Sequence, residues 1–528
     1  MAGLLRCAPL LLLLGPSCGG ADPVPAAPKD RPSVVFISVD TLTARHMSLY
    51  GYERLTTPAL DTFAERATVF ERCWANAPWT VPSYMSQFTG LNSAAFLHPS
   101  KTGTAHWDLA LPQAHRTMAE YFQDAGYRTA AFIDNPNILA DRGFAQGFDL
   151  YDDSATKLDH RHKGGGIDHI TPIALDWLDQ GPEGQPDFLF FQVLDVHGPY
   201  VAAGEFEGFF ADQPGPVSSA MVPVALSDEL IFGAIPHYIA QPVLEEGQLE
   251  VDRAILVDDY DEGIRAVDKA LGKLLQQLQT RGILDDAIVI ISADHGESMG
   301  EHDSYFSHVL NRGELLHVPL LIKLPGQAEG RRVQGNAQLI DLLPTMLELA
   351  DLPDPGGLHG QSLVASLDGA ELASVPSLSF NYFRDSESIV DGDWKLLVTN
   401  PNLANSKLIG FLSAPRTRAW LEGYFPGSKG LVYGTAALPF SVLDHTDQLK
   451  LHEDALQQLQ GPYFSLHNIA EDPGELVDLA GQYPERVQTL WARLQEIRNV
   501  ARERHIVADE VQELDAEAQA LLDKLGYK

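Results

Sequence analysis

The sequence predicts an α/β fold, in which a large, mainly parallel sheet is sandwiched by helices and followed by a smaller C-terminal α+β lobe. Three apolar runs carry this prediction, and each leads directly into an acid. The runs and their acids are Val34 to Val39 with Asp40, Phe188 to Leu194 with Asp195, and Ala287 to Ala293 with Asp294. Continuous β-branched and aromatic runs are typical of strands buried on both faces of a parallel sheet. Ligands of such sheets bind beyond the carboxyl ends of the strands, so these ends predict one shared site.

Helix signals alternate with these strand signals along the first 375 residues. Thr57 is a good N-cap and Pro58 suits a first helical turn. The segment from Asp261 to Gly282 places its apolar side chains on one stripe, as an amphipathic helix does. Ala337 to Ala350 is predicted as a further helix. Such alternation favours a mainly parallel sheet with helices on both faces.

The pattern changes near residue 375, where short strand signals begin to follow one another without long helices between them. Two irregular stretches, 204–250 and 402–460, are predicted as insertions that shape a substrate pocket. The predicted division is a signal peptide at 1–18, a tether at 19–31, the large α/β domain at 32–375, the α+β lobe at 376–480 and a helical tail at 481–528.

The first residues have the pattern of an export signal. Arg6 supplies a positive charge, Pro9 to Leu14 is a short apolar run, and small residues surround Cys18. This arrangement resembles a bacterial lipoprotein cleavage site, although an ordinary cleaved signal peptide remains the alternative. The sequence thus predicts an exported protein of the bacterial envelope or periplasm, with a lipid anchor at Cys18 as its one contact with a membrane.

The composition restricts the partners of the chain. The 528 residues carry a formal net charge of −35, so the general field of the protein opposes binding to nucleic acid or anionic lipid. Only three cysteines are present, which excludes a disulfide framework and a cysteine-based zinc site. The oligomeric state does not follow from the sequence.

The strand ends supply candidate metal ligands. Asp40, Asp294 and His295 offer carboxylate oxygens and one imidazole, a mixture that suits Mn²⁺, Zn²⁺ or Mg²⁺ better than a Ca²⁺ cage made of oxygens alone. A single Asp at a strand end is more often a turn or cap residue. Asp294 and His295 are harder to explain in that way, because two potential ligands stand side by side where the backbone leaves the sheet.

Three further residues are candidates for catalysis. Thr80 precedes a helix-like stretch, and a hydroxyl next to a metal and a helix N-terminus can act as a nucleophile. Taken alone, Thr80 is more commonly the N-cap of that helix. His197 and His308 are also expected to lie near this edge of the sheet. Each alone suits a structural role, whereas together they suit binding or protonation of the oxygens of a tetrahedral oxyanion.

Many short motifs follow one another along about residues 31–500, among them Ser38 to Leu42, Thr80 to Ser83, Phe88 to Gly90, Asp195 to Tyr200, Ser292 to Glu297, Gly300 to His302, His317 to Ile322 and Glu471 to Glu475. Together and in this order, they resemble the motifs of the sulfatase family of the alkaline phosphatase superfamily. The resemblance implies a metal-dependent ester hydrolase in which Asp40, Thr80, Asp294 and His295 hold the metal. It also implies Thr80 as nucleophile, with His197 and His308 as oxyanion-binding or proton-donating groups.

The departures from the family pattern concern the nucleophile and its surroundings. Typical sulfatases oxidise a Cys or Ser to formylglycine, whereas the β-carbon of Thr80 carries a methyl group and cannot give that aldehyde. Tyr84 stands where the family has an Arg, and Thr41 where it has a second metal acid. The stretch from Asp134 to Pro136 replaces the usual Lys- and His-containing stretch.

These departures favour phosphorus chemistry. A threonine ester cannot collapse to an aldehyde and must be attacked at phosphorus or sulfur, which suits metal-assisted in-line displacement. The expected function is hydrolysis of a sulfate, phosphate or phosphonate ester of a small molecule, glycan or lipid, with a divalent Mn, Zn, Mg or Ca ion and no formylglycine. Two alternatives remain open: a degenerate member that binds a sulfated or phosphorylated glycan, and a phosphoryl-group transferase of the cell envelope.

Overall fold

The computed structural model describes thirteen segments of the chain, which together hold both lobes. They are residues 31–96, 110–157, 166–198, 200, 204–211, 221–224, 237–240, 248–303, 311–381, 386–399, 433–435, 438–440 and 462–503. The predicted signal peptide, Cys18 and His308 lie outside the described residues, as do most of both predicted insertions and the last part of the helical tail.

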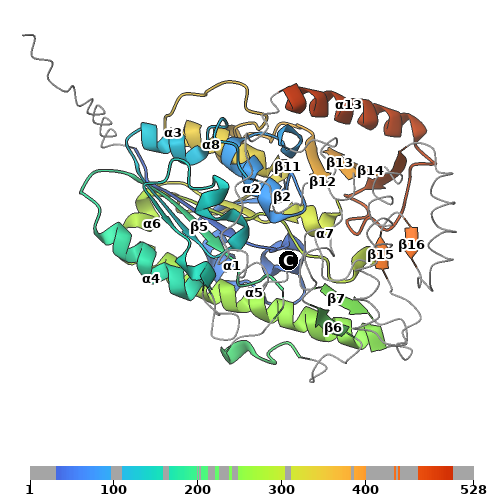
Figure 1. The fold of residues 1–528 in the computed structure, drawn as a ribbon, viewed down its shortest axis with the longest axis horizontal. Helices are drawn as coiled ribbons and strands as arrows, with labels where there is room; N and C mark the ends of the chain where they lie inside the picture. The colour runs from blue at the N-terminus through green and yellow to red at the C-terminus, as the bar shows by residue number, and fades with distance from the viewer. Residues whose placement is uncertain are drawn as a thin grey trace, which may run out of the picture.

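One large sheet forms the centre of the molecule (Figure 1). Its strands follow the order β11-β2-β10-β8-β1-β5-β3-β4, and β9 pairs with β2. The strands are β1 (Val34–Val39), β2 (Thr68–Trp74), β3 (Arg128–Ile133), β4 (Leu150–Asp152), β5 (Asp187–Val193), β8 (Ile288–Ala293), β9 (His317–Val318), β10 (Leu320–Lys323) and β11 (Arg331–Gln338). The pairs among β8, β1, β5, β3 and β4 are all parallel, and β10 is antiparallel to both of its neighbours. The predicted fold class is confirmed.

The register of the three central strands brings their carboxyl ends to one level. Val39 at the end of β1 pairs with Val193 of β5 on one side and with Ala293 of β8 on the other. All six residues of β1 and of β8 are buried, which is why both strands consist of continuous apolar runs. The acids that follow β1 and β8 therefore leave the sheet side by side.

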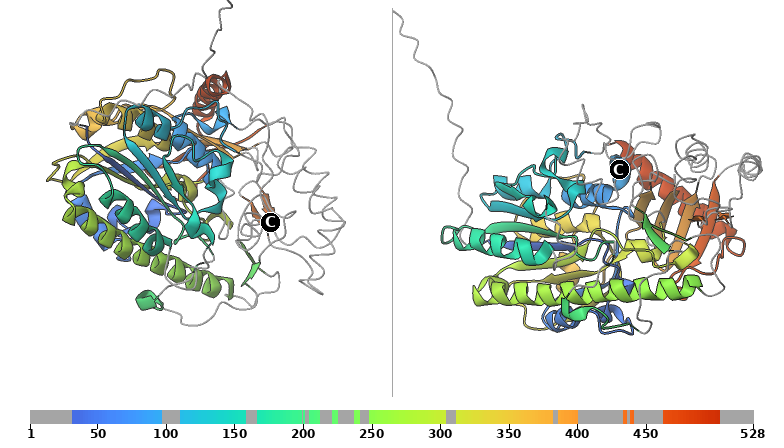
Figure 2. Two further views of the ribbon diagram at one scale, coloured as in Figure 1. Left: turned by 60° about the vertical axis from the view of Figure 1, so that its left-hand side comes forward. Right: turned by 60° about the horizontal axis from the view of Figure 1, so that its bottom comes forward.

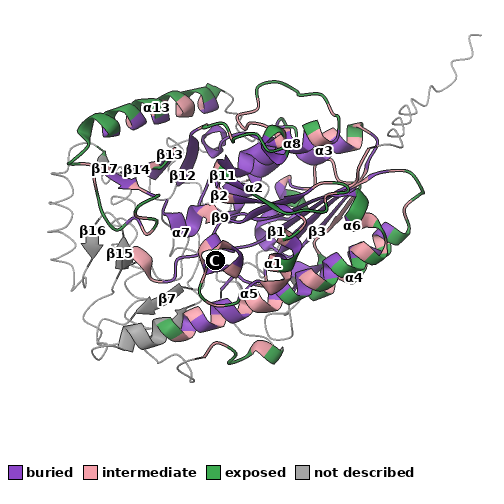
Figure 3. Ribbon diagram, turned by 180° about the vertical axis from the view of Figure 1, so that it is seen from behind, coloured by how far each residue is buried: buried purple, intermediate pink, exposed green. Residues whose placement is uncertain are grey.

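Helices cover both faces of this sheet (Figure 2). The longer helices α4 (Gly166–Asp179) and α5 (Gln248–Thr280) run along one face, and α2 (Thr80–Thr89), α3 (Met118–Asp124) and α8 (Leu342–Leu349) lie on the other. Shorter helices are α1 (Pro58–Ala64), α6 (Ile283–Asp286), α7 (Gly313–Leu316) and α9 (Val364–Leu367). Figure 3 shows that the sheet is buried, whereas α4 and α5 on one of its faces carry exposed residues on their outer sides. No helix in the described segments has the length and apolar character needed to cross a bilayer.

The C-terminal lobe is a separate antiparallel sheet with its own small core. Its order is β12 (Ser377–Asn381), β13 (Ser386–Asp391), β14 (Trp394–Thr399) and β17 (Tyr463–Asn468). Helix α13 (Pro484–Glu503) packs Leu490 and Leu494 onto the lobe core, which includes Leu396 and Leu466. Two short hairpins, β6 (Met221–Val224) with β7 (His237–Ala240) and β15 (Tyr433–Thr435) with β16 (Leu438–Phe440), complete the described strands.

Candidate active site

Asp40 follows β1 directly and is fully buried. Its backbone N–H donates to Val193 O at 2.8 Å, which continues the sheet ladder by one residue. Its Oδ2 atom accepts hydrogen bonds from the side-chain amides of Asn135 and Gln192. Its Oδ1 atom is buried, accepts no hydrogen bond from the described residues and lies 4.0 Å from His295 Nε2. One oxygen is thus held by the protein, while the other faces the imidazole.

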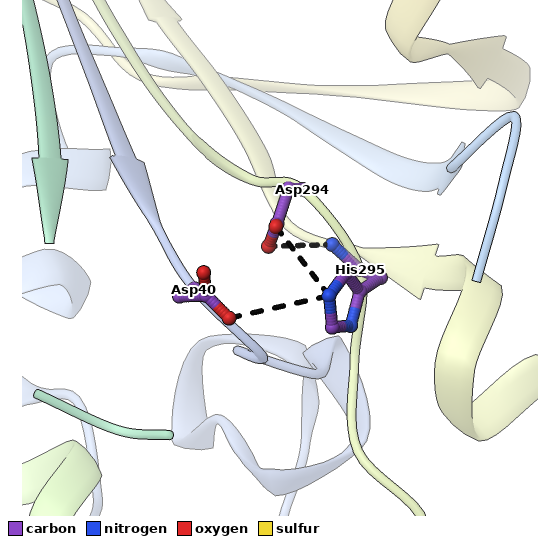
Figure 4. Close-up of side chains that lie close together, drawn as sticks. All are labelled: Asp40, Asp294 and His295. Atoms are coloured by element: carbon purple, nitrogen blue, oxygen red, sulfur yellow. Dashed lines mark hydrogen bonds and ion pairs between the residues drawn. The ribbon is translucent and has the colours of Figure 1, made fainter. Parts of the chain in front are cut away.

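Asp294 and His295 follow β8 and complete a buried cluster with Asp40 (Figure 4). The Oδ1 atom of Asp294 accepts the backbone N–H groups of Thr41 at 3.3 Å and of His295 at 2.9 Å. His295 Nδ1 lies 2.8 Å from Gly296 O. Because a carbonyl only accepts, Nδ1 is the donor, and Nε2 is the ring nitrogen that faces the cluster. This Nε2 atom is 3.4 Å from Asp294 Oδ2.

Thr80 is the first residue of α2, and its side chain is turned towards the same cluster. Its Oγ1 atom lies 3.3 Å from His295 Nε2, and only 4% of the residue is exposed. The N-cap position belongs to Trp79, and no side chain caps this helix. The alternative that Thr80 is a helix cap is therefore wrong. Ser83 Oγ donates to Asp294 O at 2.7 Å, which ties the first turn of α2 to the end of β8.

The chemistry of this cluster fits a divalent cation. One ligand atom from each of Asp40, Asp294 and His295 lies within 4.8 Å of the others. Burial, and next the charge of Asp294, raise the pKa of Asp40 well above its usual range, and burial also raises the pKa of Asp294. Oδ1 of Asp40 and Oδ2 of Asp294 are buried without a hydrogen bond from the described residues. A cation would supply both oxygens with a partner and offset the cost of burying two acids.

The two predicted histidines have different outcomes. His197 lies in the turn after β5, is buried, and its Nδ1 lies 2.6 Å from Gly198 O. Because the carbonyl only accepts, Nδ1 is the donor in that contact. The catalytic role of His197 stays a prediction. His308 lies outside the described residues, and its role stays a prediction too.

Three site residues were missed by the sequence analysis. Glu297 is buried, and burial raises its pKa to about 7 despite the opposing charge of His197 and a hydrogen bond from Tyr200. The sequence feature that could have identified Glu297 is the order Asp-His-Gly-Glu directly after β8. Gln192 is the one polar residue in the run from Phe188 to Leu194, and Asn135 lies in the stretch that departs from the family. Their polarity inside buried segments was the available clue.

The two substituted positions, Tyr84 and Thr41, are both fully buried. Tyr84 Oη donates to Ser38 Oγ at 2.9 Å. The tyrosine therefore packs in the core against the last residues of β1. Thr41 has a φ of 56°, which is left-handed backbone that β-branched residues rarely adopt. Its N–H donates to Asp294, and its carbonyl accepts from Tyr260 Oη at 2.6 Å. These contacts stabilise a strained turn beside two candidate metal ligands, Asp40 and Asp294.

Fold and site together define an α/β protein with a buried carboxylate–imidazole cluster and a hydroxyl at a helix N-terminus. The sulfatase family profile matches residues 32–352, which is more than half of the chain. The chain therefore belongs to the sulfatase family, as its motifs predicted. Several relatives are named sulfatases, so the predicted class of enzyme, a sulfatase-like ester hydrolase, is confirmed.

Individual relatives are distant. An ulvan-active sulfatase of Formosa agariphila is 27% identical over 356 residues, which is 63% of this chain and 64% of the relative's length. The multifunctional alkaline phosphatase superfamily protein PehA of Trinickia caryophylli is 30% identical over 217 residues, covering 38% of this chain and 40% of that protein. The solved phosphonate monoester hydrolase of Agrobacterium radiobacter has a TM-score of 0.62 at 18% identity and covers 89% of this chain and 96% of its own. This last likeness concerns the fold.

Proposed function

We propose that the protein is a metal-dependent hydrolase that cleaves a phosphate, phosphonate or sulfate ester through Thr80 as nucleophile, with phosphorus esters preferred. The observation that carries the proposal is the position of Thr80 Oγ1, 3.3 Å from His295 Nε2 at the start of α2. The hydroxyl of Thr80 does not cap α2 and instead lies at the cluster formed by two buried carboxylates and an imidazole. A purely structural threonine has no need of these neighbours.

The chain's own groups support each part of such a reaction. Asp40, Thr80, Asp294 and His295 would hold the ion, which when bound lowers the pKa of a hydroxyl and polarises the ester. The N-terminus of α2 places the positive end of a helix dipole beside Thr80, which favours an oxyanion there. In the proposal His197 and His308 bind the oxyanion or protonate the leaving group, and water then hydrolyses the threonine ester.

The preference for phosphorus rests on Thr80 itself. Because its β-carbon carries a methyl group, formylglycine cannot form, and release must proceed by attack of water at the central atom. Metal-assisted phosphoryl transfer uses this route. The phosphonate monoester hydrolase among the structural neighbours and the multifunctional relative are consistent with the preference, whereas the ulvan-active sulfatase keeps sulfated glycans among the candidate substrates.

A parallel assay tests the proposal. p-Nitrophenyl phosphate, bis-p-nitrophenyl phosphate, a phenylphosphonate ester and p-nitrophenyl sulfate are each incubated with Mn²⁺, Zn²⁺, Mg²⁺ or Ca²⁺. We expect metal-dependent cleavage of a phosphorus ester that falls by about 10³-fold or more in Thr80→Ala. Thr89→Ala is the matched control, because Thr89 is a buried threonine of the same helix whose hydroxyl donates to Met85 O.

Other outcomes decide between the alternatives. Cleavage of the sulfate alone would overturn the preference for phosphorus. Activity that survives in Thr80→Ala would remove Thr80 as nucleophile. A protein that binds metal and releases the alcohol only when an acceptor alcohol is present would be a transferase. No metal and no turnover would favour a binding protein for a sulfated or phosphorylated glycan.

We further propose that the chain is exported and anchored by a lipid at Cys18, since residues 1–18 resemble a lipoprotein signal and residues 19–31 a tether. Expression in a bacterial host tests this. Wild type should partition into the membrane fraction, and Cys18→Ser should not acquire the lipid and should leave that fraction. A wild-type protein found wholly in the soluble periplasm would instead indicate an ordinary signal peptide.

A further inference from the structure

We infer that Asn135 and Gln192 are positioning residues that hold Asp40 in the orientation needed to bind the metal. This inference rests on the metal dependence of the proposed function, and it extends that function to residues outside the predicted ligand set. Both residues are fully buried, and both direct a side-chain amide at the same oxygen of Asp40.

The order of the strands explains why two amides converge there. In the sheet β5 lies between β1 and β3, so Gln192 pairs with Ser38 on one side and with Ile133 on the other. Asn135 follows β3, two residues beyond Ile133. Asp40 therefore leaves β1 on the side of the sheet where β5 and then β3 follow, and both donors, Gln192 of β5 and Asn135 beyond β3, reach its Oδ2 atom.

The orientation of each amide is determined by a backbone group. Asn135 Oδ1 accepts the N–H of Asn137 at 2.7 Å, so its NH₂ group must point the other way, towards Asp40. Gln192 Oε1 accepts the N–H of Asp134 at 3.2 Å, and its Nε2 donates to Asp40 Oδ2 at 3.1 Å. Neither amide can rotate without losing a buried hydrogen bond, which is costly in the interior.

The result is a carboxylate with one oxygen held and one oxygen available. Two donors occupy Oδ2, which turns Oδ1 towards His295 Nε2, the side on which Asp294 and Thr80 also lie. Partners of this kind, which orient a ligand and do not touch the metal, commonly change metal affinity by 10- to 100-fold when removed. The stretch from Asp134 to Pro136, which departs from the family pattern, thereby gains a role at this site.

Asn92 provides a closely matched control for Asn135. Both are buried asparagines at the N-cap of a 3-10 helix, η3 (Ser93–Ala95) and η5 (Pro136–Ile138), and both accept the backbone N–H two residues later. They differ in the group that receives the amide. Asn92 Nδ2 donates to Leu378 O at 2.9 Å, whereas Asn135 donates to the Asp40 carboxylate. Replacing each by Ala removes the same cap, but only one replacement frees Asp40.

The experiment measures the dissociation constants of Mn²⁺ and Zn²⁺ for the metal-free full chain by isothermal titration calorimetry. We expect Asn135→Ala to weaken binding by about 10- to 100-fold and Asn92→Ala to leave it unchanged, although both variants lose thermal stability. Gln192→Met, which keeps the length of the side chain and removes the amide, should also weaken binding and serves if Asn135→Ala does not fold.

Equal metal affinity in Asn135→Ala, Asn92→Ala and wild type would overturn the inference even if the wild type hydrolyses esters. A wild type that binds neither ion would overturn it together with the metal dependence of the proposed function. Weakened binding in Asn135→Ala, in a protein whose wild type cleaves none of the four esters, would support the inference while the proposed reaction fails.

Discussion

At the scale of single residues, the site concentrates groups that are unfavourable without a ligand. Asp40 and Asp294 are completely buried acids with raised pKa values, and each keeps an oxygen that accepts no hydrogen bond from the described residues. Thr41 adds a strained left-handed backbone between them. Such costs persist where the surrounding structure enforces them, and they are typical of functional sites. Binding of a cation at this site should therefore increase the stability of the folded chain.

Metal binding is expected to stabilise the folded chain. A ligand present at 100 times its dissociation constant adds about 2.7 kcal/mol, which raises the melting temperature measured by differential scanning fluorimetry. The increase should be larger at pH 8 than at pH 5. Burial raises the pKa of both carboxyl groups, so protons compete with the metal as the pH falls.

Asp294→Asn is the control for this prediction. The amide keeps an oxygen that can accept the N–H groups of Thr41 and His295 but removes a buried charge. Its metal-free form should be as stable as wild type or more stable, and metal should no longer raise its melting temperature. A metal-dependent increase of wild-type size in Asp294→Asn would show that the ion binds elsewhere.

The sequence predicted those site residues whose signal is local. Asp40, Asp294 and His295 each follow a continuous apolar run, and parallel pairing with level ends brings such positions together. Asn135 and Gln192 were missed because their role is a contact between three strands, which no local pattern encodes. For Thr80 the composition of a helix start favoured a cap, and only the position of His295 shows the hydroxyl turned elsewhere.

At the scale of elements, helix and strand types were predictable and their boundaries were less so. The predicted helix from Ala337 to Ala350 begins too early, because β11 continues to Gln338 and α8 starts at Leu342. Ala337 and Gln338 pair with Cys73 and Trp74 of β2, and this long-range pairing overrides the local helical spacing. The antiparallel direction of β10 could not be predicted locally, because an apolar run does not show how a strand is oriented relative to its neighbours.

Helix α2 shows why the site is carried by an element and not by a loop. All ten of its residues are buried, and Ser83 of its first turn bonds to the end of β8. The nucleophile candidate therefore sits on a rigid helix that is attached to the strand carrying two metal-ligand candidates. Catalytic groups need placement within a fraction of an ångström, which such packing provides.

At the scale of the whole molecule, a buried network of charges joins the C-terminal lobe to the large domain. Glu475 Oε1 lies 2.7 Å from Lys395 Nζ of β14, and its Oε2 lies 3.4 Å from Arg312 Nη1, which belongs to the large domain. Arg45, just beyond the Asp40 turn, donates to Pro473 O and pairs with Glu314. The connection thus begins within a few residues of the candidate active site.

Glu475→Gln should lower the free energy of unfolding by about 3–5 kcal/mol, because it leaves Lys395 buried without its counter-charge. Burial opposes ionisation of Glu475, but Lys395, Arg312 and Arg45 hold its pKa at about 2. An acid whose pKa is lower in the folded state than in the unfolded state stabilises the fold at pH values above its unfolded pKa. The contribution of Glu475 should therefore be lost as the pH falls from about 4.5 to about 2. Urea unfolding at pH 7 and pH 3, followed by tryptophan fluorescence, measures both effects.

Glu471→Gln removes the same charge from an exposed position of the same loop and should change stability by no more than about 0.5 kcal/mol. Equal stability of the two variants at pH 7 would mean that the lobes are held by apolar contacts and that the ion pairs add nothing.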